Sequence, residues 1–153
     1  MTVRYIGIDP GTACGWAILS ADGRRVASGT WDLASKRHEG GGMRFLRCRR
    51  ALEELILEGD RVGYEEVARH RGTAAAHVYG GIVAQVTAHC ETVGASYSGR
   101  PVGSVKKHAT GKGNSGKPAM VSAAEGRWGS VGDDNEADAL WVADHLRAEL
   151  ETR

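Results

Sequence analysis

The sequence predicts an α/β protein with a mixed five-stranded sheet, in which three antiparallel strands come first and parallel strands follow, flanked by helices. Three short strand-like stretches separated by tight turns open the chain, and helical and strand patterns alternate after them. This order is typical of a sheet with helices packed on it. The chain has 153 residues, 41% hydrophobic and 25% charged, so we expect residues 1–153 to form a single domain.

The first three strands are predicted to form an antiparallel meander. Residues 3–9 alternate and then run apolar, which is typical of a buried strand. Residues 14–20 and 25–31 continue as strands, and the tight turn at residues 21–23 joins them. Residues 34–42 are rich in glycine and charge, and we expect them to form a flexible loop.

Helical and strand patterns alternate in the middle of the chain. Residues 43–57 have apolar side chains at helical spacing and an arginine-rich opposite face. A short strand over residues 61–66 precedes an alanine-rich helix over residues 73–93. The Gly80-Gly81 pair in that helix predicts a close helix contact, either within the core or at a seam between two copies of the chain. The last strand is expected within residues 95–105.

The C-terminal third is predicted to hold a loop and two helices. Residues 106–118 are basic and glycine-rich, which favours a loop. His108 in this loop is open to two interpretations, a proton-transfer group or an exposed side chain. Pro118 begins a short helix, and Asp134 or Asn135 caps the last helix.

The net charge of +1 conceals a segregated distribution of charge. Residues 36–50 carry six basic residues against one glutamate, and residues 99–127 again carry six against one. Residues 128–153 carry seven acidic residues against two arginines. The pattern indicates either a polyanion held beside carboxylates or a solvated charged surface.

Several classes of protein are excluded by composition. No apolar run approaches the roughly 20 residues that a membrane helix needs, so we expect no membrane association. The N-terminus lacks the apolar core of a signal peptide, which predicts a cytoplasmic location. The three cysteines are widely spaced and no CxxC pair occurs, which favours reduced thiols and no zinc site.

Two acidic positions fall at the ends of predicted strands. Asp9 ends the first strand, where a buried carboxylate is costly unless a positive charge compensates it. Glu65 and Glu66 end the fourth strand and point to opposite faces of the sheet, so one of them can lie beside Asp9. Alternatively, Asp9 caps a turn, and Glu65 and Glu66 are solvated charges at the edge of the sheet.

A third acidic group opens the last predicted helix. Asp134 and Asp138 are spaced i, i+4, whereas Asn135 and Asp138 are spaced i, i+3, so either pair shares one face. Helix capping explains the first acids, but Asp138 lies a turn further in. Carboxylates without Cys or His at ligand spacing suit Mg²⁺ or Mn²⁺. Two such ions can drive phosphodiester hydrolysis.

These motifs, in this order, resemble the RuvC family of Holliday junction resolvases, and within it the bacteriophage-type members. The segments that carry the resemblance are Gly7–Thr12 with Gly15–Ala17, Tyr64–Val67, Val105-Lys106, Lys117 and Glu136–Leu140. The resemblance covers nearly the whole chain. It implies a ribonuclease H-like fold, a homodimer, two divalent metal ions, and paired nicks in four-way DNA junctions that leave 5′ phosphates. It also implies a bacterial cell or a phage-infected host.

The resemblance assigns roles to individual residues. Asp9, Glu65 and Asp138 match the family's metal-binding acids, with Glu65 preferred over its neighbour. Lys106 and Lys117 match two lysines that the family uses near the cleaved phosphate. Mg²⁺ is the expected cofactor, with two ions per active site, and Mn²⁺ is able to substitute.

The chain departs from the family pattern in two places. The family has Asp or His three residues before its last aspartate, where this chain has Asn135. Either Asn135 or Asp134 is able to complete the metal site, and the extra negative charge favours Asp134. Residues 67–70 lack the aromatic side chain with which cellular members wedge the junction, so the substrates are expected to include forks or flaps.

The predicted function is therefore a metal-dependent, structure-selective DNA endonuclease. Predicted DNA-binding side chains are Arg44, Arg47, Arg69, His70, Arg71, Lys106, Lys107, Lys112 and Lys117. One alternative is a nucleic-acid-binding module that has the same fold without catalysis. The other is an ATP-binding protein of the actin/Hsp70 type, which shares Gly-x-Asp-x-Gly-Thr but needs two larger lobes than this length allows.

Overall fold

The computed structural model describes residues 2–152 as a sheet of five strands with five helices. The strands are β1 (Arg4–Asp9), β2 (Ala13–Ser20), β3 (Arg25–Asp32), β4 (Arg61–Glu66) and β5 (Ser96–Pro101). The helices are α1 (Met43–Leu55), α2 (Thr73–Val93), α3 (Val102–Thr110), α4 (Lys117–Trp128) and α5 (Asp134–Glu151). All five predicted strands and the predicted helices are present.

The strand order in the sheet is β3-β2-β1-β4-β5. The pairs β1–β2 and β2–β3 are antiparallel, whereas β1–β4 and β4–β5 are parallel. This confirms the predicted mixed sheet. Because β1 is central and β4 lies parallel beside it, the carboxyl ends of these two strands meet at one edge of the sheet.

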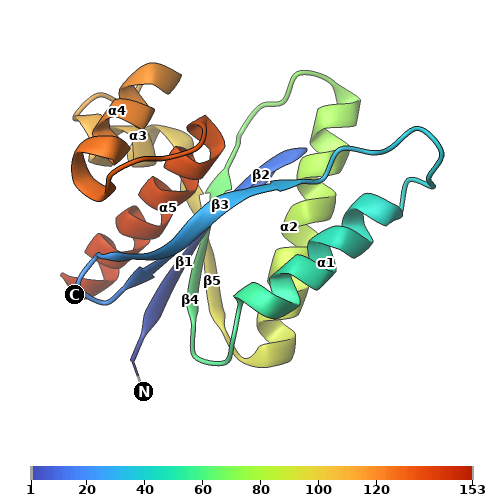
Figure 1. The fold of residues 1–153 in the computed structure, drawn as a ribbon, viewed down its shortest axis with the longest axis horizontal. Helices are drawn as coiled ribbons and strands as arrows, with labels where there is room; N and C mark the ends of the chain where they lie inside the picture. Colours follow the sequence, from blue (N-terminus) through green and yellow to red (C-terminus); the bar gives the residue numbers. More distant parts are fainter. Residues whose placement is uncertain (1, 153) are drawn as a thin grey trace.

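Helices cover both faces of the sheet in three layers (Figure 1). One core lies between the sheet and the pair α1 and α2, and it includes Ile6, Ile8, Leu52, Ile82 and Val86. On the other face, α5 packs on β1 and β2 through Ala139, Leu140 and Ala143. The helices α3 and α4 pack against α5 through a third cluster that includes Val105 and Trp141.

Side chains of β1 alternate between these cores. Ile6 and Ile8 are fully buried on the α1 and α2 side, and Tyr5 is fully buried against α5. A strand buried on both faces has an apolar run rather than an alternation, which is why residues 3–9 predicted a buried strand.

The predicted loop over residues 106–118 is wrong in its first half, because α3 runs through residue 110. Val105 is buried, and the packing of this turn on α4 and α5 outweighs its polar composition. Gly111, with φ of +86°, ends the helix. The predicted cap of α5 is also displaced by one residue, because the N-cap is Asp133.

The glycine pair of α2 has two different surroundings. A Cβ on Gly81 would lie 2.2 Å from the ring of Phe45, so this glycine permits the close contact between α1 and α2. Gly80 has no neighbouring atom at that position within 4 Å. The predicted close helix contact is therefore confirmed within the chain for Gly81.

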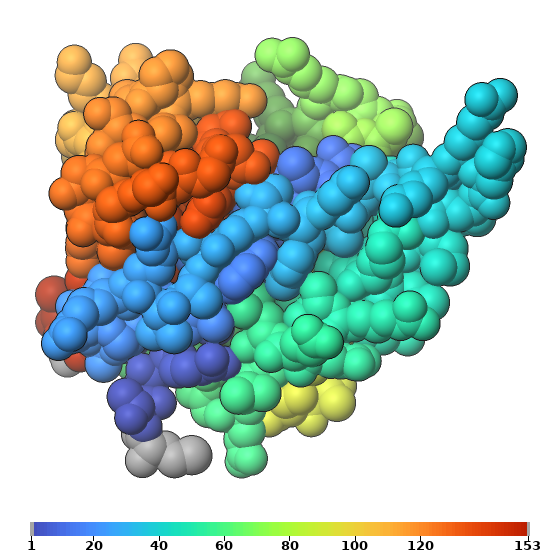
Figure 2. Space-filling view, in the orientation of Figure 1, coloured from blue at the N-terminus to red at the C-terminus, as the bar shows by residue number. Residues whose placement is uncertain are grey.

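The segment between β3 and α1 projects from the body of the molecule (Figure 2). Its base is held by Arg47, which donates hydrogen bonds to both carboxylate oxygens of Glu39 at 2.8 and 3.0 Å. The three cysteines are free, as predicted, and all three are buried. No helix within residues 2–152 combines the length and the apolar character needed to cross a bilayer.

Candidate active site

Asp9 is the last residue of β1, and its side chain lies on the face of the sheet that α5 covers. Two glycines on this face allow α5 to approach closely. A Cβ on Gly7 would lie 2.0 Å from the carbonyl oxygen of Ala139, and a Cβ on Gly15 would lie 1.9 Å from that of Asn135. These absent side chains bring the first turns of α5 directly over the end of β1.

Glu65 lies beside Asp9 because of the register of two parallel strands. In that register Ile8 pairs with Tyr64, so the next residues along the two strands are Asp9 and Glu65. Both side chains are on the same face of the sheet, since equivalent positions of paired strands share a face. Glu66 alternates to the opposite face, which separates it from Asp9.

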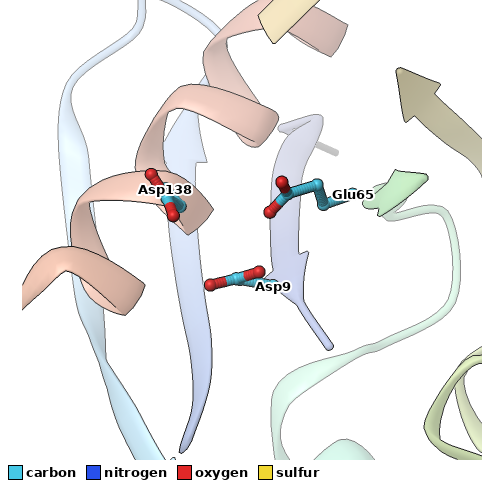
Figure 3. Close-up of side chains that lie close together, drawn as sticks. All are labelled: Asp9, Glu65 and Asp138. Atoms are coloured by element: carbon cyan, nitrogen blue, oxygen red, sulfur yellow. The ribbon is translucent and has the colours of Figure 1, made fainter. Parts of the chain in front are cut away.

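The helix α5 supplies the third acid. Its N-cap, Asp133, accepts a hydrogen bond from the backbone N–H of Glu136 at 2.8 Å. Asp138 lies one turn further along the helix and points toward the ends of β1 and β4 (Figure 3). One carboxylate oxygen from each of Asp9, Glu65 and Asp138 lies within 4.8 Å of the other two. Three segments far apart in sequence thus form one cluster, which we call the acidic triad.

The carboxylates of the acidic triad repel one another when no cation is bound. Burial, together with a hydrogen bond to Glu65 and the charges of neighbouring carboxylates, raises the pKa of Asp9 well above its ordinary value. Burial and the charges of Glu65 and Asp134 raise the pKa of Asp138 to about 7. Asp9 and Asp138 therefore resist ionisation in this cluster, and a bound cation would remove the repulsion between the carboxylates.

The donor set fits a divalent cation that prefers hard oxygen ligands. The triad consists of partly buried carboxylates, and no histidine or cysteine belongs to the cluster in the described part of the chain. Mg²⁺ and Mn²⁺ suit such a set, whereas zinc sites favour nitrogen and sulfur. Asp9, Glu65 and Asp138 are the side chains that would hold the metal.

Asp134 and Asn135 occupy different positions at the start of α5. A carboxylate oxygen of Asp134 lies 3.5 Å from Nζ of Lys117, and its negative charge contributes to the raised pKa of Asp138. Asn135 presents its backbone carbonyl to Gly15. Within residues 2–152 the closely spaced triad does not include Asp134, so its part in metal binding stays a prediction.

Two predicted phosphate-binding lysines lie within electrostatic reach of the triad. The positive charges of Lys106, on α3, and Lys117, at the start of α4, both oppose the rise that burial and neighbouring carboxylates cause in the pKa of Asp138. Lys117 is exposed, and Lys106 is half-buried. The surface is hollowed between α4 and the N-terminal part of α2 (Figure 2). Lys117 belongs to the helix that borders this depression.

The other predicted DNA-binding side chains differ in how available their charges are. Exposed members of the set are Arg69, Arg71, Lys107 and Lys112. Arg47 is committed to Glu39 and to the carbonyl of Ala34, so its charge secures the projecting segment. Arg44 has no carboxylate partner in residues 2–152, and it lines a cavity together with His70.

Asp144 is a fully buried acid outside the triad, and its structural role was not recognised in the sequence. Nε2 of His108 lies 2.7 Å from one of its oxygens, Arg127 donates to the same oxygen, and Arg147 donates to the other at 3.0 Å. Burial opposes ionisation of Asp144, but the hydrogen bonds from His108 and Arg127 outweigh it and lower its pKa to about 2. This network ties α3 and α4 to α5.

One of the two interpretations of His108 is confirmed, because the residue is exposed even though it contacts the buried Asp144. It lies on a helix rather than in a loop. It does not belong to the acidic triad. The sequence held one usable signal, because Asp144 follows the buried Leu140 by four residues and so shares its helix face.

The sheet order and the acids at the ends of β1 and β4 define the class: this is the ribonuclease H-like fold. Within that class, the architecture is that of RuvC. The structure of RuvC from Thermus thermophilus superposes with a TM-score of 0.79 at 21% identity, covering 99% of this chain and 98% of that one. RuvC of the same organism in complex with a Holliday junction substrate also gives 0.79, at 22% identity over 99% and 97% of the two chains.

The other comparisons found no match. No protein-family model matches the chain, and no curated protein sequence matches it either. At the identity of the two solved structures, the likeness establishes the fold. The function has to be argued from the residues at the site.

Proposed function

We propose that this chain is a metal-dependent DNA endonuclease, formed by one domain over residues 1–153, that cleaves four-way junctions. The observation that carries the proposal is the convergence of Asp9, Glu65 and Asp138, whose carboxylate oxygens lie within 4.8 Å of one another. Partly buried carboxylates at this spacing repel one another, and a divalent cation is the natural partner for them.

The residues have separable tasks in the proposed reaction. The acidic triad, completed by Asp134, would hold two Mg²⁺ ions, and Mn²⁺ would substitute. When bound, such ions activate water and stabilise the negative charge on the cleaved phosphate. Lys106 and Lys117 neutralise phosphate oxygens beside the triad. The exposed arginines and lysines hold the DNA backbone without reading its sequence.

Branched DNA is the proposed substrate class. A relative in fold was solved in complex with a Holliday junction substrate, and the charges of Lys106 and Lys117 act on Asp138 of this chain's acidic triad. A four-way junction presents two equivalent strands, so paired nicks require two active sites and thus a homodimer. Residues 67–70 lack an aromatic wedge, which favours a wider range that includes forks and flaps. The expected products carry 5′ phosphates.

The test is cleavage of a synthetic four-way junction, compared with fork, flap, duplex and RNA–DNA hybrid, in the presence and absence of Mg²⁺. The Asp9→Asn variant should lose nicking and keep junction binding, because the change removes a metal ligand and leaves the basic surface intact. Glu66→Gln is the matched control, since this neighbouring acid points to the other face of the sheet. Full activity of Asp9→Asn would remove Asp9 from the mechanism.

Each alternative predicts a different result in this experiment. A non-catalytic module would bind the junction and leave it intact with either metal, despite its complete triad. A protein of the actin/Hsp70 type would be stabilised by ATP in a thermal shift assay. Residues 2–152 form one sheet with five helices and no second lobe of the kind that such proteins need, so we expect no shift.

A further inference from the structure

The buried Asp144 connects the helix of Asp138 to the helices of the two lysines. Three side chains within residues 2–152 contact its carboxylate, and two of them come from other helices, since His108 belongs to α3 and Arg127 to α4. The third, Arg147, lies on α5 itself. A change in how α3 meets α5 would therefore pass through the contact between His108 and Asp144.

His108 has a second contact with α5 besides this carboxylate. Its ring meets that of Trp141 edge-on, with the two centroids 5.8 Å apart. Trp141 precedes Asp144 by three residues, so the two side chains lie on one face of α5. The imidazole is therefore held by two groups of α5, although the residue is exposed.

These contacts fix the rotation of α3 about its own axis. The helix has nine residues, and Val105 is the one among them that is buried. Val105 lies three residues before His108, so both side chains face α5. Lys106 follows Val105 directly, about 100° further around the helix. The way in which Val105 and His108 meet α5 thus decides where the Lys106 ammonium points.

On the proposed function, the structure assigns His108 as a positioning residue that is anchored on Asp144 and holds Lys106 beside the acidic triad. The charge of Lys106 acts on Asp138, so the ammonium lies within electrostatic reach of a phosphate bound there. A phosphate-binding group that is displaced by about 1 Å can slow a reaction about a hundredfold. Neither His108 nor Asp144 lies in the segments that resemble the RuvC family.

The experiment removes the His108 contact and measures the rate constant of junction cleavage with Mg²⁺ at saturating protein. His108→Leu should slow cleavage about ten- to a hundredfold, and it should leave the junction affinity, measured without metal, unchanged. This variant should still fold, because Arg127 and Arg147 continue to neutralise Asp144. His108→Gln, whose amide nitrogen can donate to Asp144, should recover most of the lost rate. Arg147→Met is the matched control, since Arg147 contacts the same carboxylate from within α5, and it should cleave at the wild-type rate.

A double-mutant cycle separates positioning from general damage to the fold. In a Lys106→Ala background, which lacks the group that His108 positions, His108→Leu should slow cleavage by less than about twofold. In a Lys117→Ala background, His108→Leu should keep its full effect on the rate. Equal effects in the wild-type and Lys106→Ala backgrounds would overturn the positioning role, and so would a wild-type rate for His108→Leu.

A measurement without DNA or metal distinguishes a failure of this inference from a failure of the proposed function. The ε-carbon NMR signal of Lys106, identified by its absence from Lys106→Ala, should shift in His108→Leu and stay in place in Arg147→Met. An unmoved signal in His108→Leu would overturn the positioning role even in an active nuclease. A shifted signal, in a protein whose wild type cleaves no junction, would retain the positioning of Lys106 and refute the nuclease function.

Discussion

The backbone of Asn135 rests directly against Gly15: the space a Cβ would take at Gly15 is 1.9 Å from the carbonyl oxygen of Asn135. This contact sets how closely the start of α5 approaches the end of β1. Because Asp138 follows on the same helix, the contact also sets the distance between Asp138 and Asp9. Gly15, which has no functional side chain, therefore controls the geometry of the acidic triad.

Gly15→Ala should therefore affect both stability and metal binding. The added methyl group meets backbone rather than a flexible side chain, so α5 has to move, and we expect a loss of about 1–3 kcal/mol. Denaturant unfolding measures this loss, and calorimetry with Mn²⁺ should show weaker binding. Gly40→Ala is the control, since nothing lies within 4 Å of a Cβ there. Unimpaired Mn²⁺ binding by Gly15→Ala would contradict this account of the triad.

The metal-free protein should become less stable as the pH rises toward 8. The folded-state pKa of Asp138 is about 7, above its ordinary value near 4, because burial and neighbouring carboxylates oppose its charge. Between pH 4 and 7 the folded chain therefore still holds a proton that the unfolded chain has already released. By linkage, this contribution to stability is lost as pH rises through about 7.

Asp138→Asn isolates that effect. Relative to this variant, wild type without metal should lose on the order of 2 kcal/mol between pH 5 and 8, measured by denaturant unfolding at each pH. Glu66→Gln should keep the wild-type pH dependence, because Glu66 is on the other face of the sheet. Identical pH profiles of wild type and Asp138→Asn would show that Asp138 ionises without hindrance.

Asp144→Asn should lower the free energy of unfolding, because Asp144 links α3 and α4 to α5. The change removes the buried negative charge that His108, Arg127 and Arg147 share, so we expect a loss of about 2–3 kcal/mol at neutral pH. Because its folded-state pKa is about 2, below the ordinary value, the wild-type advantage should vanish as pH falls from 4 to 2. Asp22→Asn, in an exposed pair with Arg24, should not change the unfolding midpoint.

DNA affinity should fall steeply with salt, because binding to phosphates releases counterions. Lys112→Ala should reduce the slope of log affinity against log salt by about 0.9 if Lys112 contacts one phosphate. Arg24→Ala serves as the control, since Arg24 lies in the turn between β2 and β3 and pairs with Asp22. A salt-independent affinity would exclude the basic stretches as the DNA surface.

Local pattern was enough to place the strands, most helices and the candidate acids. The apolar run over residues 3–9 identified a buried strand, and the structure shows that this strand lies at the centre of the sheet. The alternation at Glu65 and Glu66 made clear that only one of them could accompany Asp9. These features are local, since they depend on the side-chain periodicity of a single segment.

Other features depended on packing between distant segments. The helix α3 formed where composition favoured a loop, because Val105 is buried against α4 and α5. The partners of Asp144 come from three helices, and no spacing within one helix reveals such a set. Whether Asp9, Glu65 and Asp138 meet depended on strand register and on two glycines that let α5 approach. The sequence by itself determined which side chains carry charge and where the strands that bear Asp9 and Glu65 end. Only the tertiary structure decided the distances between these side chains, because those distances are set by contacts across the fold.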